Sequence, residues 1–209
     1  MNKIELLKRY VAPHGDRITK ILDMGDYYGA TNAQVILMIP KTHIPEGINP
    51  DDLSVNPPDT SFVFKSIKRL VPLEFELSKL ILALSNVPKV QEHDDCHQCD
   101  GWGKIECPCC DNETTCKECD GTGEGDPISG QYTYNYEHYL QLDNSYFVVG
   151  NIEDLVNMMI GLEFKPEQTI KLIASDYLKP HIFEVEDVKI ILMPANPGYV
   201  DKEKVIKIC

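Results

Sequence analysis

The 209-residue chain lacks features that mark several common classes of protein. No apolar run near its N-terminus resembles a secretory signal, and no stretch approaches the roughly 18 apolar residues of a membrane-spanning helix. We therefore expect a cytoplasmic protein without membrane contact. Because thiols stay reduced in the cytosol, its eight cysteines are expected to bind metal rather than to form disulfides.

The motifs of common enzymes are also missing. The sequence contains no Ser-His-Asp arrangement, no glycine-rich phosphate loop and no His-x-Glu pattern of a zinc hydrolase. The paired carboxylates Asp94 and Asp95 stand beside cysteines and are interpreted as surface charge. These absences predict a protein that is not an enzyme and has no catalytic residues.

Basic charge is scarce, and the net charge of −13 is unevenly distributed. Residues 91–126 hold eleven Asp or Glu against two Lys, a net charge of −9, whereas residues 1–90 have a net charge of +1. Proteins that bind nucleic acid usually present a basic surface. DNA contact is therefore not expected for residues 91–126 and is possible only through the rest of the chain. There Lys65, Lys68 and Arg69 form either a solvated strand face or a phosphate-contacting patch.

Seven of the eight cysteines lie between residues 96 and 123. The pattern C-x-x-C-x-G-x-G occurs there twice, with its cysteines at Cys96, Cys99, Cys116 and Cys119. Each C-x-x-C turn can direct two thiolates at one cation, and the glycines allow the backbone to turn sharply beneath it. The two turns predict one tetrahedral Zn²⁺ site that folds the segment. Four protein ligands leave no open position, so the site is expected to be structural.

The cysteines between the two turns allow several interpretations. Cys107 and Cys110 could bind a second Zn²⁺ together with Cys109, His93 or His97, could replace one outer pair, or could remain free thiols. The same segment could act as a redox dithiol, which would need a basic neighbour or a helix N-terminus to stabilise a thiolate. His93 and His97 could equally be solvated loop residues.

Trp102 is the one tryptophan of the chain and follows the first C-x-x-C turn. Packing against the metal-binding turn is the simpler expectation for it. On an exposed tip, it could instead anchor a protein partner.

Hydrophobic periodicity predicts helices and short strands on both sides of the cysteine segment. The expected helices cover residues 3–11, 72–86 and a segment capped by Asn151, with Glu153 and Asp154 in its first turn. The expected strands cover residues 18–22, 27–31, 34–39, 61–70, 131–142, 146–149, 169–174, 181–186 and 188–193.

A helix followed by three strands occurs near both ends of the chain. Each unit ends on a similar apolar strand, Ile36–Pro40 in the first and Ile190–Pro194 in the second. We predict an α+β fold of two similar helix-plus-antiparallel-sheet halves that pair their sheets. Residues 1–90 and 127–209 would form this body, and residues 91–126 would form an inserted zinc module.

The cysteine segment resembles the cysteine-rich domain of DnaJ-type co-chaperones. The resemblance lies in the two complete C-x-x-C-x-G-x-G repeats, and it implies zinc binding and contact with polypeptides. The third cysteine group, Cys107 to Cys110, lacks the glycines of a repeat, and no His-Pro-Asp tripeptide of a J-domain occurs in the chain.

The body resembles a DNA polymerase sliding-clamp domain of the bacterial type. The matching segments are Leu6-Leu7, Asp16-Arg17, residues 28–32, Val71-Pro72, Lys179-Pro180 and residues 190–194. The resemblance implies two helix-plus-sheet halves and a role in DNA metabolism. A ring would need several copies of the domain, so a homo-oligomer is possible.

Together these patterns predict a non-enzymatic zinc-binding protein with a clamp-like body, an accessory or adaptor protein in DNA metabolism that binds a protein partner. The alternative is a DnaJ-like chaperone or interaction module that binds polypeptide through its zinc finger. A thiol oxidoreductase is the one enzymatic alternative.

Overall fold

The computed structural model describes residues 2–13, 18–54, 72–107, 112–173 and 179–208. Two compact units make up the chain. We call residues 1–87 and 136–209 the body, and residues 88–135 the cysteine module. No described helix is long and apolar enough to cross a membrane.

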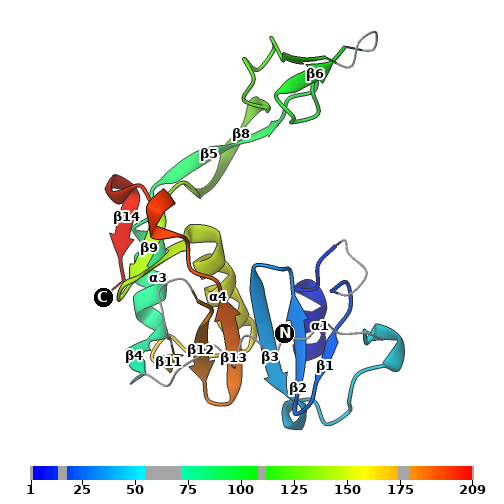
Figure 1. Ribbon diagram of the computed structural model, residues 1–209, viewed down its shortest axis with the longest axis vertical. Helices are drawn as coiled ribbons and strands as arrows, with labels where there is room; N and C mark the ends of the chain where they lie inside the picture. Colours follow the sequence, from blue (N-terminus) through cyan, green and yellow to red (C-terminus); the bar gives the residue numbers. More distant parts are fainter. Residues whose placement is uncertain (1, 14–17, 55–71, 108–111, 174–178, 209) are drawn as a thin grey trace. The chain divides into compact units, whose positions relative to one another are not determined.

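A seven-stranded antiparallel sheet organises the body (Figure 1). Its strands, in spatial order, are β1 (Leu22–Met24), β2 (Tyr27–Thr31), β3 (Val35–Pro40), β13 (Val188–Leu192), β12 (His181–Val185), β11 (Thr169–Ile173) and β4 (Leu73–Glu76).

The two apolar strands that end the predicted halves pair with each other at the centre of this sheet. In the β3–β13 pair, Leu37 stands opposite Ile190 and Ile36 opposite Ile191. Leu37 and Ile190 are almost completely buried. The predicted α+β class is confirmed, and one continuous sheet joins the strands of both halves.

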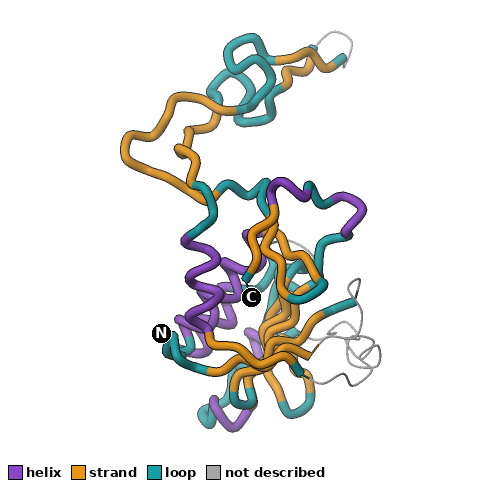
Figure 2. Tube along the Cα trace, turned by 90° about the vertical axis from the view of Figure 1, so that its left-hand side faces the viewer, coloured by secondary structure: helices purple, strands orange, loops and turns teal. Residues whose placement is uncertain are grey.

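Within the described residues, three α-helices accompany the sheet: α1 (Lys3–Arg9), α3 (Leu77–Ser85) and α4 (Val149–Gly161). They gather on one side of the body strands, and α4 contacts both α1 and α3 (Figure 2). Since α4 lies between α1 and α3, it forms the centre of the helical layer, and its apolar face buries Ile152, Leu155 and Met159.

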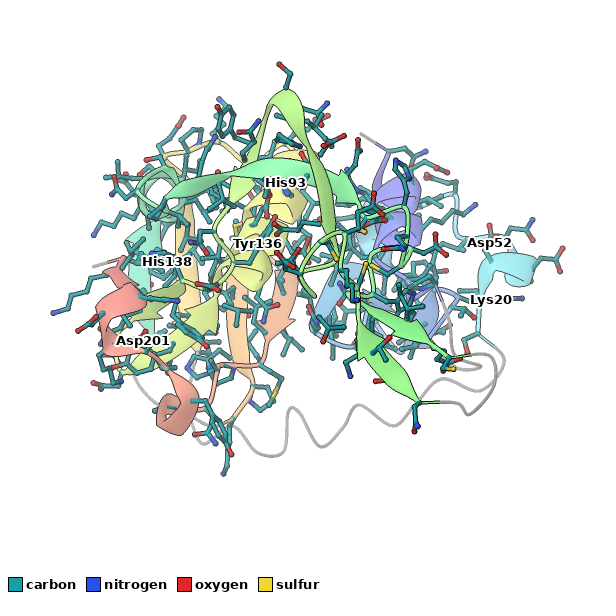
Figure 3. All side chains as sticks on the ribbon, turned by 90° about the horizontal axis from the view of Figure 1, so that it is seen from above. Lys20, Asp52, His93, Tyr136, His138 and Asp201 are labelled. Atoms are coloured by element: carbon teal, nitrogen blue, oxygen red, sulfur yellow. The ribbon has the colours of Figure 1, made fainter. Side chains whose placement is uncertain are left out.

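A smaller sheet packs against α4 through two of its strands. It contains β10 (Ser145–Val148), β9 (Tyr139–Leu142) and β14 (Val205–Lys207), with β14 parallel to β9. Tyr136, just before this sheet, donates a 2.8 Å hydrogen bond to Glu153 of α4 (Figure 3). Short 3₁₀-helices cover Lys41–His43, Pro50–Asp52, Pro197–Tyr199 and Lys202–Lys204.

The cysteine module consists of two antiparallel ribbons joined by the cysteine turns. The longer ribbon pairs β5 (Lys89–Asp95) with β8 (Glu124–Tyr134). The shorter ribbon pairs β6 (Lys104–Glu106) with β7 (Glu113–Thr115). None of the residues of these strands is buried and most are exposed, so the strands themselves provide little buried area.

Some predicted boundaries are wrong for identifiable reasons. Leu73 lies in β4, not in a helix, because residues 73–76 complete the sheet beside β11 and bury Phe75. Asn151 does not cap α4. The helix begins three residues earlier than predicted, with Val148 at its N-cap position, because this places Val149 and Ile152 in the core.

Two predicted strands also differ. Residues 18–20 form no strand, and β1 begins only at Leu22, where it pairs with β2. The predicted strand over 131–142 is broken into β8 and β9 by residues 135–138, where the chain passes from the module to the body. The predicted strand over 61–70, with Lys65, Lys68 and Arg69, lies outside the described residues.

Candidate metal centre

Four cysteine sulfurs converge at the middle of the module. The Sγ atoms of Cys96, Cys99, Cys116 and Cys119 all lie within 4.8 Å of one another. Both the Cys96–Cys116 and the Cys99–Cys119 sulfur pairs are 3.8 Å apart. A tetrahedron with Zn–S bonds of ~2.3 Å places its sulfurs about 3.8 Å apart. The cluster therefore has the dimensions of a four-thiolate metal site.

The backbone around the sulfurs is nearly two-fold symmetric. We call residues 96–103 the first knuckle and residues 116–123 the second knuckle. Each begins with a hydrogen bond to the end of the other: the Cys96 amide donates to the Gly123 carbonyl at 2.8 Å, and the Cys116 amide donates to the Gly103 carbonyl at 2.9 Å. The two knuckles therefore hold each other in place.

Each knuckle also directs a backbone amide at one of its sulfurs. Gly103 donates to the Cys99 sulfur at 3.1 Å, and Gly123 donates to the Cys119 sulfur at 3.3 Å. Hydrogen bonds of this kind stabilise the thiolate over the thiol. They make these sulfurs better metal ligands, because a metal binds the deprotonated form.

The thiols of the cluster have unlike proton affinities. Burial raises the pKa of Cys96 to about 12, and burial likewise raises the pKa of Cys99. Burial also acts to raise the pKa of Cys119, but the amide of Gly123 and the neighbouring Cys116 thiol lower it, and the result is about 6. At neutral pH the lowered pKa of Cys119 thus favours its thiolate, while the raised pKa of Cys96 favours its thiol.

The sulfurs form the centre of the module. Among its described residues, the only buried apolar side chains are those of Cys96, Cys99 and Cys116, against which Ile105 and Cys119 pack. A unit of this size without a larger apolar core needs another source of stability, and small domains of this kind commonly use a metal.

The other predicted ligands that the structure describes are not part of this cluster. Cys107 is described, but its sulfur is not among the four; its amide donates to the Asn112 carbonyl at 2.9 Å. Cys109 and Cys110 lie outside the described residues. His93 on β5 is exposed (Figure 3), and its Nδ1 lies 3.1 Å from the Gly125 carbonyl oxygen. His97 is exposed and lines a small cavity next to Cys96.

Trp102 does not pack against the knuckle. Its side chain is 82% exposed, although its amide keeps the knuckle hydrogen bond to the Cys99 carbonyl at 2.9 Å. The simpler expectation for this residue is therefore wrong. The sequence also gave no sign of Gln98, whose Oε1 lies 3.4 Å from the Cys116 sulfur, because no spacing rule links these two positions.

No protein-family model matches the sequence, and no curated protein matches it significantly. Among solved structures, the chain is similar to the Helicobacter pylori beta clamp bound to a DNA ligase peptide, at 8% identity over 92% of this chain and 62% of that one, with a TM-score of 0.46. It is also similar to Caulobacter crescentus pol III beta, at 12% identity over 92% of this chain and 63% of that one, with a TM-score of 0.46.

A third similar structure is the DNA polymerase III subunit beta of Pseudomonas aeruginosa, at 13% identity over 93% of this chain and 64% of that one, with a TM-score of 0.43. The chain thus spans a little under two thirds of the length of these structures. The likeness is distant and identifies neither a partner nor a function for this chain.

Proposed function

We propose that the chain is a non-enzymatic zinc-binding adaptor, in which one Zn²⁺ folds the cysteine module and the body carries it. The observation that supports this best is the convergence of four cysteine sulfurs with two spacings of 3.8 Å. Four thiolates in a tetrahedron suit Zn²⁺, and they leave no position for water or substrate. The proposed metal is therefore structural.

The described body contains one pair of side chains that resembles a catalytic nucleophile and base, and its burial supports a non-enzymatic role. The Ser145 hydroxyl and His181 Nε2 are 2.7 Å apart, as in a catalytic pair. Both side chains are more than nine-tenths buried, and the Phe147 ring packs edge-on against His181. A substrate would have to enter the hydrophobic core to reach Ser145, so the pair is better explained as a satisfied polar contact that fixes β10 to β12.

The role in DNA metabolism is the less direct part of the proposal and rests on the sequence resemblance of the body to a sliding-clamp domain. Direct DNA contact through α4 has little support, since this helix carries Glu153 and Asp154 and neither Lys nor Arg. We therefore propose that the chain acts by holding a protein. Light scattering of the purified chain, with DNA binding measured at several salt concentrations, tests this part: a monomer without DNA affinity would remove a clamp-like role.

Metal analysis of the purified chain tests the central proposal. We expect about one zinc per chain, with loss of the metal in Cys116→Ser and full retention in Cys107→Ser. Iron in place of zinc would give a coloured protein and would contradict the assignment. Two zinc ions per chain, with one lost in Cys107→Ser, would instead assign a second site to Cys107 and Cys110.

A further inference from the structure

The two knuckles share a backbone fold, and the largest of the three side-chain differences between them is at Trp102 and Thr122. Asp100 and Asp120 have matching left-handed backbones, with φ of 48° and 49°. Trp102 and Thr122 occupy equivalent places: their amides donate to the carbonyls of Cys99 at 2.9 Å and of Cys119 at 3.0 Å. Since threonine completes one knuckle, tryptophan is not needed to build the other. The exposed indole of Trp102 is thus available for another use.

A cavity of about 640 Å³ opens beside Trp102, between the first knuckle and the short β6–β7 ribbon. Gln98, Cys99, Asp100, Trp102, Lys104, Ile105, Glu106 and Glu113 line it. Trp102 and Ile105 provide its large apolar surfaces. Exposed tryptophan is rare on free surfaces and common at the energetic centres of protein interfaces.

The charges around the cavity identify what it could hold. Its one cation, Lys104, is already paired with Glu113 at 2.6 Å. The other two acidic residues that line the cavity are Asp100 and Glu106, and within the described residues no ion pair neutralises either carboxylate. The module as a whole contains only three lysines and no arginine, so its own side chains provide little positive charge.

We propose that this cavity docks a basic segment of a partner polypeptide, which places an arginine or lysine side chain over the Trp102 ring. A cation above an indole face is attracted by the ring, and arginine also stacks on it with its plane. Asp100 and Glu106 then pair with the same cation or with the next basic side chain. The acidic module repels nucleic acid, whose phosphates carry the same sign of charge as its surface.

This inference rests on the proposed zinc-held module, because the knuckle that carries Trp102 is fixed by Cys96 and Cys99. It adds the chemistry of the partner and the residues that meet it. The two proposals can fail separately, since zinc content is measured on the same samples as binding.

Binding of a fluorescein-labelled, arginine-rich peptide to the zinc-loaded full chain tests the proposal by anisotropy. A peptide of the same length with glutamate in place of arginine serves as the control. Because Trp102 is the chain's one tryptophan, its own fluorescence reports unlabelled peptide directly. We expect saturable binding of the basic peptide, a change in Trp102 emission, and weakening as salt concentration rises.

The symmetry of the knuckles provides matched control variants. Trp102→Ala should weaken peptide binding roughly tenfold, as expected for an interface anchor, and Trp102→Phe should restore part of it. Thr122→Ala, at the equivalent place in the second knuckle, removes the hydroxyl that donates to the Cys119 carbonyl but should leave peptide binding unchanged. Asp100→Asn should weaken binding while Asp120→Asn does not; asparagine tolerates the left-handed backbone of both positions.

Four outcomes would overturn the proposal while zinc remains at one per chain. These are no binding of the basic peptide, equal binding by Trp102→Ala, equal affinity for the acidic peptide, and preferential binding of single-stranded DNA. Dimerisation that is lost in Trp102→Ala would assign the cavity to a second copy of this chain instead. Absence of zinc from the purified chain would overturn both proposals together.

Discussion

Gly103 and Gly121 face each other across the two knuckles so closely that a Cβ on Gly103 would lie 2.2 Å from the Gly121 carbonyl oxygen. The symmetry-related pair shows the same approach, because a Cβ on Gly123 would lie 2.2 Å from the carbonyl oxygen of Gly101. The glycines of the repeated pattern are therefore needed for the contact between knuckles as well as for the turn within each one.

Replacement of Gly103 by alanine should disrupt the metal site. The added Cβ clashes with the backbone, and φ of 69° at this position is unfavourable for any residue with a side chain. Gly130→Ala is the matched control, since Gly130 has φ of 77° but nothing within 4 Å of the added atom. We expect Gly103→Ala to lose most of its zinc and Gly130→Ala to keep it at a cost of about 1 kcal/mol. Equal zinc content in the two variants would contradict this account.

Removal of the metal should unfold the module and leave the body folded. The buried centre of the module consists of the cysteines themselves, whereas the body has its own core around β3, β13 and α4. Hydrogen exchange with and without a strong zinc chelator measures this. Amides of β6 and β7 should lose protection, and those of β3 and β13 should keep it. Loss of protection throughout the chain would show that the body depends on the metal.

Zinc affinity should fall as the pH decreases, and more steeply below about pH 6. Binding releases the protons of the thiols, including that of Cys96, whose pKa is raised to about 12 by burial. Below its pKa of about 6, Cys119 is also protonated in the metal-free chain, so one more proton is released and affinity drops about another tenfold per pH unit. Competition with a chelator from pH 5 to 8 measures the zinc affinity as a function of pH. Cys107→Ser should leave this pH dependence unchanged.

Truncation of Leu37 should destabilise the body through the junction of its two halves. Leu37 is fully buried and stands opposite Ile190 where β3 meets β13. We expect Leu37→Ala to cost about 2–5 kcal/mol in unfolding free energy. Leu82→Ala, on the exposed face of α3, should change it by less than about 0.5 kcal/mol. Urea unfolding followed by circular dichroism compares them, and zinc content should be the same in both.

Asp154 on α4 should lower the stability of the body at neutral pH. Partial burial and the nearby charge of Glu153 raise its pKa, so the folded state holds this proton more tightly than the unfolded state. Its contribution is therefore favourable at low pH and is lost as the pH rises through the folded-state pKa. Asp154→Asn should raise the melting temperature at pH 7, and the gain should shrink as the pH is lowered toward 4. An equal gain at both values would exclude ionisation as the cause.

Features that depend on residues close together in the sequence could be predicted, and features that depend on distant residues could not. The metal-binding turns are local: C-x-x-C sets two sulfurs side by side, and the following glycines permit the positive φ that each turn adopts. Hydrophobic periodicity likewise predicted α1, all of α3 and the strands β2, β3, β11, β12 and β13. Boundaries failed where a distant partner decided the outcome, as at Leu73, which pairs with Leu172 of β11.

The sequence by itself determined the two cysteine turns, the acidic character of their segment and the apolar strands that end each half, because these properties need only neighbouring residues. Tertiary structure decided that β3 and β13 pair, that Asn151 lies inside α4, and that Trp102 stands exposed beside a cavity. Each of these depends on which surfaces meet after the chain has folded. For Trp102 the reason is the knuckle symmetry: a backbone closed by hydrogen bonds and sulfur needs no aromatic side chain to cover it.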